Sequence, residues 1–195
     1  MASILENLDS LTPSEIKGKQ EESLEWFRQN LRKTRLSPRQ LAQEGEPLKT
    51  PLPLIGSMIM FNYDAKWQDV LPYWDKFPVV IPFDFSKGGF IGLNLHYIAP
   101  RYRTMLLMGL LDYAYDVDGG EDDDTRLRLT YQLLQSTAEL KWYKPCVKRY
   151  LTSHIKGTIR TIPYDNWDVI AMLPTQRFEG ANANTVYADS RRKVV

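Results

Sequence analysis

Residues 79–97 read VVIPFDFSKGGFIGLNLHY, and this stretch decides the fold of the chain. Two apolar runs, 79–85 and 90–97, flank the sequence SKGG, whose small and flexible residues are typical of a hairpin turn. The pattern therefore predicts two antiparallel strands joined by a tight turn at 86–89. Because Pro82 has no backbone N–H to donate, we expect the first strand to lie at a sheet edge or to end near this proline.

A third strand is predicted just upstream, over residues 57–63, where the sequence is SMIMFNY. Successive side chains of a strand point to opposite faces, and this run is mostly apolar, so we expect both faces to be at least partly covered. The connection at 71–78, LPYWDKFP, contains two prolines that push their preceding residues toward extended geometry, so it cannot be helical throughout. Three strands in succession, two of them joined by a hairpin, predict an antiparallel sheet.

After these strands the apolar residues recur every three to four positions, which is the period of an amphipathic helix. This period predicts helices over 100–113, 125–142 and 145–157. Two more strands are expected over 158–162 and 169–174. Strands followed by helices and then by strands predict an α+β fold, in which a small antiparallel β-sheet is packed against a layer of helices.

The N-terminal part of the chain lacks the apolar residues of a core. Residues 1–54 are polar, and five Gly and Pro residues crowd into positions 45–56, a density at which no regular element is expected. We therefore predict three parts. An extended basic N-terminal arm with short helices covers 1–54, a single α+β domain covers 55–180, and a polar C-terminal tail covers 181–195.

The composition is that of an ordinary globular protein. Of the 195 residues, 43% are hydrophobic and 25% are charged, which excludes global disorder. No apolar run approaches the roughly 18 residues needed to span a bilayer, so we expect no membrane partner. A single cysteine excludes an internal disulfide and a Cys-rich zinc framework, and it indicates a reducing compartment.

The formal net charge is only +1, but the charged residues are clustered along the sequence. Two stretches contain several basic residues and no acidic one. The first basic block consists of Arg28, Arg32, Lys33, Arg35 and Arg39. The second basic block consists of Lys141, Lys144, Lys148, Arg149, Lys156 and Arg160. Such clusters fit the binding of a polyanion, because each neutralised phosphate releases counterions, and we take both blocks as candidate DNA-binding residues. The alternative is that these side chains cover solvated surfaces and promote solubility.

Aromatic residues are numerous, with five Trp and eleven Tyr. Exposed aromatic rings near basic residues can stack on nucleic-acid bases, and the same residue types are enriched in protein–protein interfaces. The sequence does not separate these two roles. The candidate interface residues in the strand-and-loop region are Tyr63, Trp67, Tyr73, Trp74, Tyr97 and Tyr102.

The sequence contains none of the common catalytic motifs. It has no Gly-rich phosphate loop and no serine in a nucleophile elbow. The acidic stretch 112–124 fails as a calcium loop, because the required glycine and glutamate positions do not match. A two-metal nuclease built from Asp64, Asp75, Asp84 and Lys87 is a minor alternative. We predict a non-enzymatic protein with no catalytic residues, no metal site and no cofactor.

Two side chains with reactive chemistry are predicted to be structural. Cys146 follows Pro145 at a predicted helix start, where nearby lysines could lower the pKa of its thiol, but a free cysteine is more often a small core residue. His96 alternates with Leu95 and Tyr97 at a strand end, and we expect it to be half-buried with satisfied hydrogen bonds.

Several stretches resemble a known group of viral proteins. They are GSMIMFNYD at 56–64, LPYWDKFP at 71–78, GFIGLNLHY at 89–97, KPCVKRYL at 144–151, Trp167-Asp168 and Leu173-Pro174. Together they span most of residues 26–190. The chain resembles structural proteins of large contractile-tailed phages, in particular the DNA end protector or head-completion family, whose members carry a basic arm ahead of the first strand.

This resemblance implies a virion protein without enzymatic activity that binds and caps the terminus of packaged double-stranded DNA during head completion, shielding it from host exonuclease. It implies other virion proteins and double-stranded DNA ends as partners, in a multi-subunit assembly that forms in the host cytoplasm. It brings no catalytic residues. One alternative has equal weight: a neck, tail or baseplate component held by protein–protein contacts without DNA binding.

Overall fold

The structure is a computed structural model, and it describes residues 46–47, 55–107, 143–163, 166–167, 169 and 173–192. Several predictions fall outside these residues and stay predictions. They are the arm over 1–54 apart from Glu46–Pro47, the first basic block, Lys141, the helix over 125–142 and the reading of the acidic stretch 112–124.

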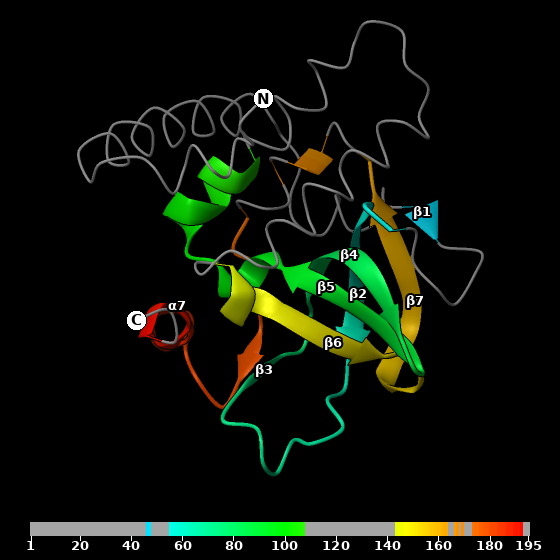
Figure 1. The fold of residues 1–195 in the computed structure, drawn as a ribbon, viewed down its shortest axis with the longest axis horizontal. Coiled ribbons are helices and arrows are strands. Elements are labelled where there is room, and N and C mark those ends of the chain that lie inside the picture. Colours follow the sequence, from blue (N-terminus) through cyan, green and yellow to red (C-terminus); the bar gives the residue numbers. More distant parts are fainter. Residues whose placement is uncertain are drawn as a thin grey trace, which may run out of the picture.

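A six-stranded antiparallel sheet forms the centre of the described part of the chain, with the strand order β1-β7-β2-β4-β5-β6 (Figure 1). Its strands are β1 (Glu46–Pro47), β2 (Met58–Tyr63), β4 (Val79–Ser86), β5 (Gly89–Asn94), β6 (Val147–Leu151) and β7 (Ile155–Ile162). A second, two-stranded sheet pairs β3 (Trp74–Asp75) with β8 (Phe178–Glu179). Residues 100–107 are helical, and the helix α7 (Ala183–Arg192) contacts the 3-10 helix η1 (Leu95–Tyr97). An antiparallel sheet accompanied by helices confirms the α+β class.

The hairpin at 86–89 is confirmed. β4 and β5 pair antiparallel as far as Ser86 and Gly89, so that Lys87 and Gly88 form the turn. Gly88 has a φ of 77°, a left-handed conformation that residues with a Cβ rarely adopt. The turn chemistry visible in the sequence is therefore the chemistry that the fold uses.

Both faces of β2 are buried, which explains its nearly unbroken apolar sequence. Met58 and Met60 lie in the main core, whereas Ile59 and Phe61 lie in a second cluster on the opposite face. We call this second cluster the aromatic core; its rings are Phe61, Tyr63, Phe90 and Tyr150. Phe61 meets Tyr150 edge-on, with 5.2 Å between ring centroids. The prediction that both faces of this strand are covered is confirmed.

The prediction that Pro82 marks a sheet edge is wrong, because β4 lies between β2 and β5. Two features allow a proline inside the sheet. The register with β5 shifts between Pro82 and Asp84, as at a β-bulge. On the other side, the carbonyl of Pro82 accepts a hydrogen bond from Gly56 N–H at 2.8 Å. Because the N and C=O of a strand residue face the same neighbour, the missing donor of Pro82 faces the chain just before β2, past the β2–β4 pair of Ile59 and Val80.

The helix predicted over 145–157 is wrong. After the 3-10 helix η2 (Lys144–Cys146) the chain forms β6, the 3-10 helix η3 (Thr152–His154) and then β7, which includes the strand predicted over 158–162. β6 pairs along the whole of Gly89–Leu93 in β5, and the hydrogen bonds of this edge override the local helical pattern. A Cβ at Gly89 would lie 1.8 Å from the carbonyl oxygen of Tyr150, so the close approach of the two strands requires glycine there.

Two other strand predictions need correction. β5 ends at Asn94 instead of continuing to Tyr97, because the Asn94 side chain accepts a hydrogen bond from the His96 backbone N–H at 2.9 Å and turns the chain into η1. The strand predicted over 169–174 is wrong at Val169, which is helical.

The polar tail predicted over 181–195 also needs correction, because most of it forms α7. Asn182 caps the helix, accepting a hydrogen bond from the Thr185 backbone N–H at 2.9 Å. Val186 is fully buried in the main core, and Tyr187 beside it is also buried. A short helix needs only a few apolar residues to pack on an existing core, so the polar composition of 181–195 did not indicate α7.

Candidate functional site

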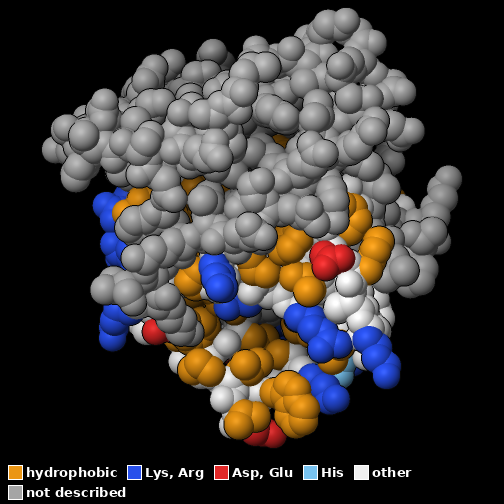
Figure 2. All heavy atoms as spheres, in the orientation of Figure 1, with side chains coloured by type: hydrophobic (Ala, Val, Ile, Leu, Met, Phe, Trp, Pro, Cys, Tyr) orange, Lys and Arg blue, Asp and Glu red, His pale blue; other side chains and the backbone are white. Residues whose placement is uncertain are grey.

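A groove lies between the loop that leads into β3 and the strand β6, which pairs only with β5 in the described part of the chain. Its volume is about 350 Å³, with one wall from residues 65–74 and the other from residues 148–151. Tyr63, Asp75 and Tyr97 complete the lining. On the face that carries the loop and β6, Figure 2 shows hydrophobic side chains next to Lys and Arg side chains.

The groove brings together residues of two kinds that were predicted separately: candidate interface aromatics and candidate DNA-binding cations. All the candidate interface aromatics except Tyr102 line it, together with Lys148 and Arg149 of the second basic block. Lys66, which the sequence analysis did not single out, lines it as well. Aromatic rings and cations in one hollow are the groups that bind a nucleotide, by stacking on its base and by pairing with its phosphate. Tyr102 instead lines a small cavity beside α7.

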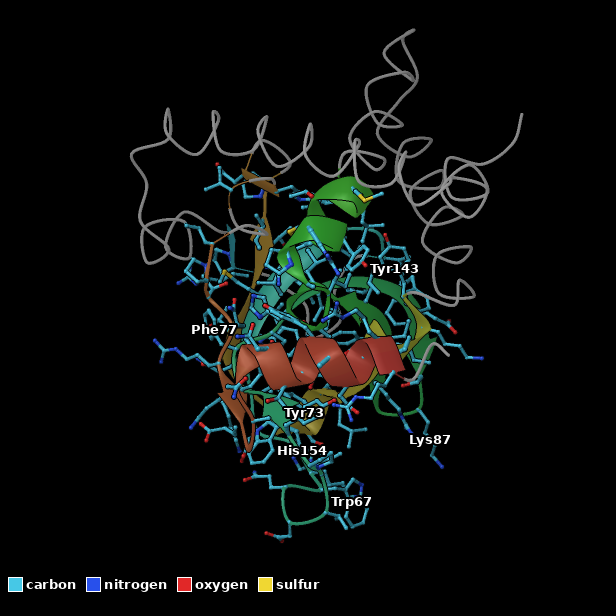
Figure 3. The ribbon with its side chains drawn as sticks, turned by 90° about the vertical axis from the view of Figure 1, so that its left-hand side faces the viewer. Trp67, Tyr73, Phe77, Lys87, Tyr143 and His154 are labelled. Carbon is cyan, nitrogen blue, oxygen red and sulfur yellow. The ribbon has the colours of Figure 1, made fainter. Side chains whose placement is uncertain are left out.

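The aromatic side chains of the groove differ in how far a ligand can reach them. Trp67 is 61% exposed, and Figure 3 shows it near the far end of the loop, beyond Tyr73 and His154. Tyr73 and Trp74 are half-buried, whereas Tyr63 and Tyr97 are buried. The accessible rings are therefore on the loop wall, and the buried tyrosines support the groove from beneath. Sequence alone carried no signal for this difference.

The cations of the groove are held in place by neighbouring groups. Lys148 Nζ lies 4.2 Å from the ring centroid of Tyr97, and Lys66 Nζ lies 5.0 Å from that of Trp67. The Arg149 guanidinium donates to the Lys87 carbonyl at 2.7 Å and to the Ser86 hydroxyl at 3.2 Å. A cation that is already positioned loses less conformational entropy when it binds an anion.

The other described members of the second basic block do not line the groove. Lys144 is exposed in η2, Lys156 pairs with Asp64 at 3.7 Å, and Arg160 lies on β7. The structure therefore brings together only Lys148 and Arg149 at this site. The DNA-binding role assigned to the other members stays a prediction.

The loop wall is anchored to α7 through Tyr73. The Tyr73 hydroxyl donates a hydrogen bond to the Asp189 carboxylate, and burial raises the pKa of Tyr73 above its ordinary value. The helix α7, which the polar sequence of 181–195 did not predict, therefore helps to position the groove. A second anchor comes from β3, through Asp75.

Asp75 lies at the centre of a buried polar network beneath the groove. Its carboxylate lies 2.7 Å from His96 Nδ1 and accepts hydrogen bonds from the backbone N–H groups of Phe77 and Arg177. Because a carboxylate only accepts, His96 Nδ1 carries the proton, and His96 Nε2 accepts from the Thr175 hydroxyl at 2.9 Å. Burial lowers the pKa of His96 despite the opposing effect of Asp75, which favours this neutral form.

We interpret this network as structural. Its order of carboxylate, imidazole and hydroxyl resembles a nucleophile relay, but His96 has no exposed surface through which a substrate atom could reach it. The network joins β3 and the segment before β8 to η1, and so fixes one wall of the groove. The sequence predicts a half-buried histidine with satisfied hydrogen bonds; in the structure the hydrogen bonds of His96 are satisfied, but the residue is completely buried.

The described residues also bear on the other chemistry that the sequence raised. In these parts of the chain no group of three or more His, Cys, Asp or Glu is placed to hold a metal ion, and no helix is long and apolar enough to cross a membrane. Cys146 is buried in the main core, and burial raises the pKa of its thiol to about 12. The interpretation of Cys146 as a core residue is confirmed.

Comparison with known families identifies a relationship that spans nearly the whole chain. The sequence model of the family described as "Phage T4 terminal DNA protecting protein" matches residues 3–191, a range that includes both walls of the groove and all of α7 except its last residue. No curated protein and no solved structure matches the chain. The resemblance noted from the sequence is therefore confirmed at the level of the family. The chain belongs to the phage T4 terminal DNA protecting protein family.

Proposed function

We propose that this protein binds and caps the terminus of double-stranded DNA during phage head completion, as a non-enzymatic virion component, and that the groove is its DNA contact. The observation that carries the proposal is the meeting of accessible aromatic rings with Lys66, Lys148 and Arg149 in one hollow, in a member of a family named for protecting terminal DNA. Capping requires little base readout, because phosphate contacts position a protein without specifying sequence.

The charges of the groove predict the salt dependence of binding. If its three cations each neutralise one phosphate, log K should fall with log salt concentration at a slope of about −2.7. The first basic block would steepen this slope if it also contacts the duplex. A measured slope near zero would show that phosphate contacts are not the basis of binding.

A second candidate function is favoured by a different observation. Val70 is 74% exposed and Leu71 is 42% exposed, next to Trp67 on the same loop. Exposed apolar residues that are contiguous often mark protein–protein contacts. This favours a neck, tail or baseplate component held by other virion proteins, with the loop as the contact surface and no DNA affinity.

Exonuclease protection separates the two functions. Linear duplex DNA is digested from its ends in the presence of the full chain at about 50 mM salt, where phosphate contacts are strong. We expect slower digestion that an excess of unlabelled linear duplex relieves and an equal mass of closed circular duplex does not. Absence of protection, or equal relief by circular DNA, would contradict terminal capping.

A pair of double variants assigns the effect to the groove. Lys148→Gln with Arg149→Gln removes two groove cations and should abolish most of the protection. Lys76→Gln with Arg101→Gln removes the same charge from exposed residues outside the groove and both basic blocks, and should leave protection intact. Equal losses in the two double variants would mean that net charge, and not the groove, determines binding.

A further inference from the structure

We propose that the groove holds a single unpaired nucleotide at the end of the DNA, with the base against the aromatic loop wall and the phosphate against β6. This inference rests on the proposed function and specifies what the site recognises: a frayed or overhanging terminus in preference to a blunt base pair. Shape, stacking, charge and the cost of extruding a base each support it.

The shape of the site favours one base over a base pair. A base pair is a broad flat plate that stacks on an open platform, whereas this site is a hollow between two walls. Its volume of about 350 Å³ is at the lower end of the range for small-ligand pockets, which suits one nucleotide.

The loop wall carries the aromatic rings on which a base could stack. Trp67 is the most exposed ring of the groove, and the half-buried Tyr73 and Trp74 lie further along the same wall. Base–aromatic stacking tolerates every sequence, because each base has a π-face. A protein that caps ends of arbitrary sequence requires this kind of tolerance.

The opposite wall carries the charge for the phosphate. Lys148 and Arg149 both line this wall: Lys148 Nζ lies over the Tyr97 ring, and the guanidinium of Arg149 is fixed by Ser86 and by the carbonyl of Lys87. A terminal phosphate monoester carries a charge of about −1.5 to −2 at pH 7, more than an internal diester. A nucleotide at a terminus therefore matches the polarity of the groove: aromatic on one side, cationic on the other.

The cost of exposing a base explains how such a groove distinguishes an end from the interior of a duplex. An internal base must be unpaired and unstacked before it can enter a pocket, which costs a few kcal/mol, and the cost is smallest for a base that is already single-stranded. An overhanging nucleotide enters without that cost. End preference then follows from duplex energetics, with no sequence readout.

The test uses hairpin DNA with one accessible end, labelled in the loop and presented as a blunt terminus or with four unpaired thymidines at the 3′ or the 5′ side. Fluorescence anisotropy with the full chain should give tighter binding to an overhang than to the blunt end, by about 5-fold or more. Hexathymidylate alone should bind and quench tryptophan fluorescence. Equal affinity for blunt and overhanging hairpins would overturn the inference.

Variants at two exposed aromatic positions make the test specific. Trp67→Ala should weaken binding of the overhang by about 5- to 150-fold, the loss of one stacked base, and Trp67→Phe should restore part of it. Phe85→Ala is the matched control, because Phe85 is 51% exposed but does not line the groove. Equal effects of Trp67→Ala and Phe85→Ala would refute a role for the loop wall.

The outcomes for the inference and for capping are distinguishable. If the protein protects linear ends but does not prefer an overhang, capping stands and the nucleotide pocket is wrong. If hexathymidylate binds through Trp67 but linear ends are not protected, the pocket stands and capping is wrong. If no oligonucleotide binds and an extended peptide docks beside β6 instead, the groove is a protein contact and the inference is wrong.

Discussion

Replacement of Asp75 by Asn tests whether the buried network holds the groove wall in place. The Asp75 side chain is 1% exposed, and the substitution preserves its shape while it turns one acceptor oxygen into an amide donor. Every hydrogen bond of the carboxylate in the described residues comes from a donor: His96 Nδ1, Asn94 Nδ2, and the backbone N–H groups of Phe77 and Arg177. The new amide nitrogen must therefore face at least one donor.

The size of the effect follows from which partners can adapt. If the remaining carbonyl oxygen keeps the two backbone donors, the new amide faces His96 and Asn94. His96 can move its proton to Nε2 and donate to the Thr175 hydroxyl, whereas the Asn94 amide loses one bond and keeps its bond to the Tyr150 hydroxyl. Loss of one charge-assisted bond, with weaker bonds to the backbone, should lower the free energy of unfolding by about 2–4 kcal/mol.

Thermal and urea unfolding followed by circular dichroism measure this loss. For a chain of this length about 3 kcal/mol lowers Tm by about 6–12 °C. Asp69→Asn makes the same charge change at an exposed loop position and should shift Tm by less than about 2 °C. A Tm for Asp75→Asn within that range would show that the network does not stabilise the fold, and the structural interpretation of Asp75 would be wrong.

Three further predictions concern the same framework. Burial holds the pKa of His96 below its ordinary value of 6.5, so below that pH the unfolded chain binds more protons than the folded chain. The free energy of unfolding should therefore fall as pH drops from about 6.5 to 5. Urea unfolding at each pH measures this slope, and His96→Asn should flatten it. Gly89→Ala should lower the free energy of unfolding by about 2–3 kcal/mol, because its Cβ would clash with the backbone of Tyr150. Lys87→Ala in the adjoining turn should change the free energy of unfolding by no more than about 0.5 kcal/mol. A stable Gly89→Ala protein would contradict the close approach of β5 and β6. Cys146 should resist a thiol reagent in the native protein and react once urea unfolds it; stoichiometric labelling of the native chain within minutes would contradict its burial.

The sequence predicts the parts of this fold that local chemistry determines. Two apolar runs around Ser86–Gly89 predict the β4–β5 hairpin, and the apolar sequence of 57–63 predicts a strand that is covered on both sides; both predictions are confirmed. The helix predicted over 145–157 failed because its outcome depends on a partner elsewhere in the chain. The backbone of β5 is available to pair with this segment, and the sequence of 145–157 alone does not indicate that partner.

The buried network could not have been predicted for the same reason. Asp75, His96 and Thr175 are far apart in the sequence, and each is an ordinary polar residue in its own segment. Only the turn of the chain at Asn94 into η1 and the pairing of β3 with β8 bring them together. A histidine at the end of an apolar strand was the single available signal, and it indicated burial without indicating partners.

The strand order decides which members of the second basic block can act together. β6 and β7 are separated in sequence only by η3, but β6 pairs with β5 whereas β7 pairs with β2 and β1. A cluster of charges along the chain is therefore divided between two places in the sheet. If Lys156→Gln with Arg160→Gln weakens DNA binding as much as loss of Lys148 and Arg149 does, phosphates must be contacted at both places, and the duplex must extend well beyond the groove. If only the β6 pair matters, the contact is confined to the terminus.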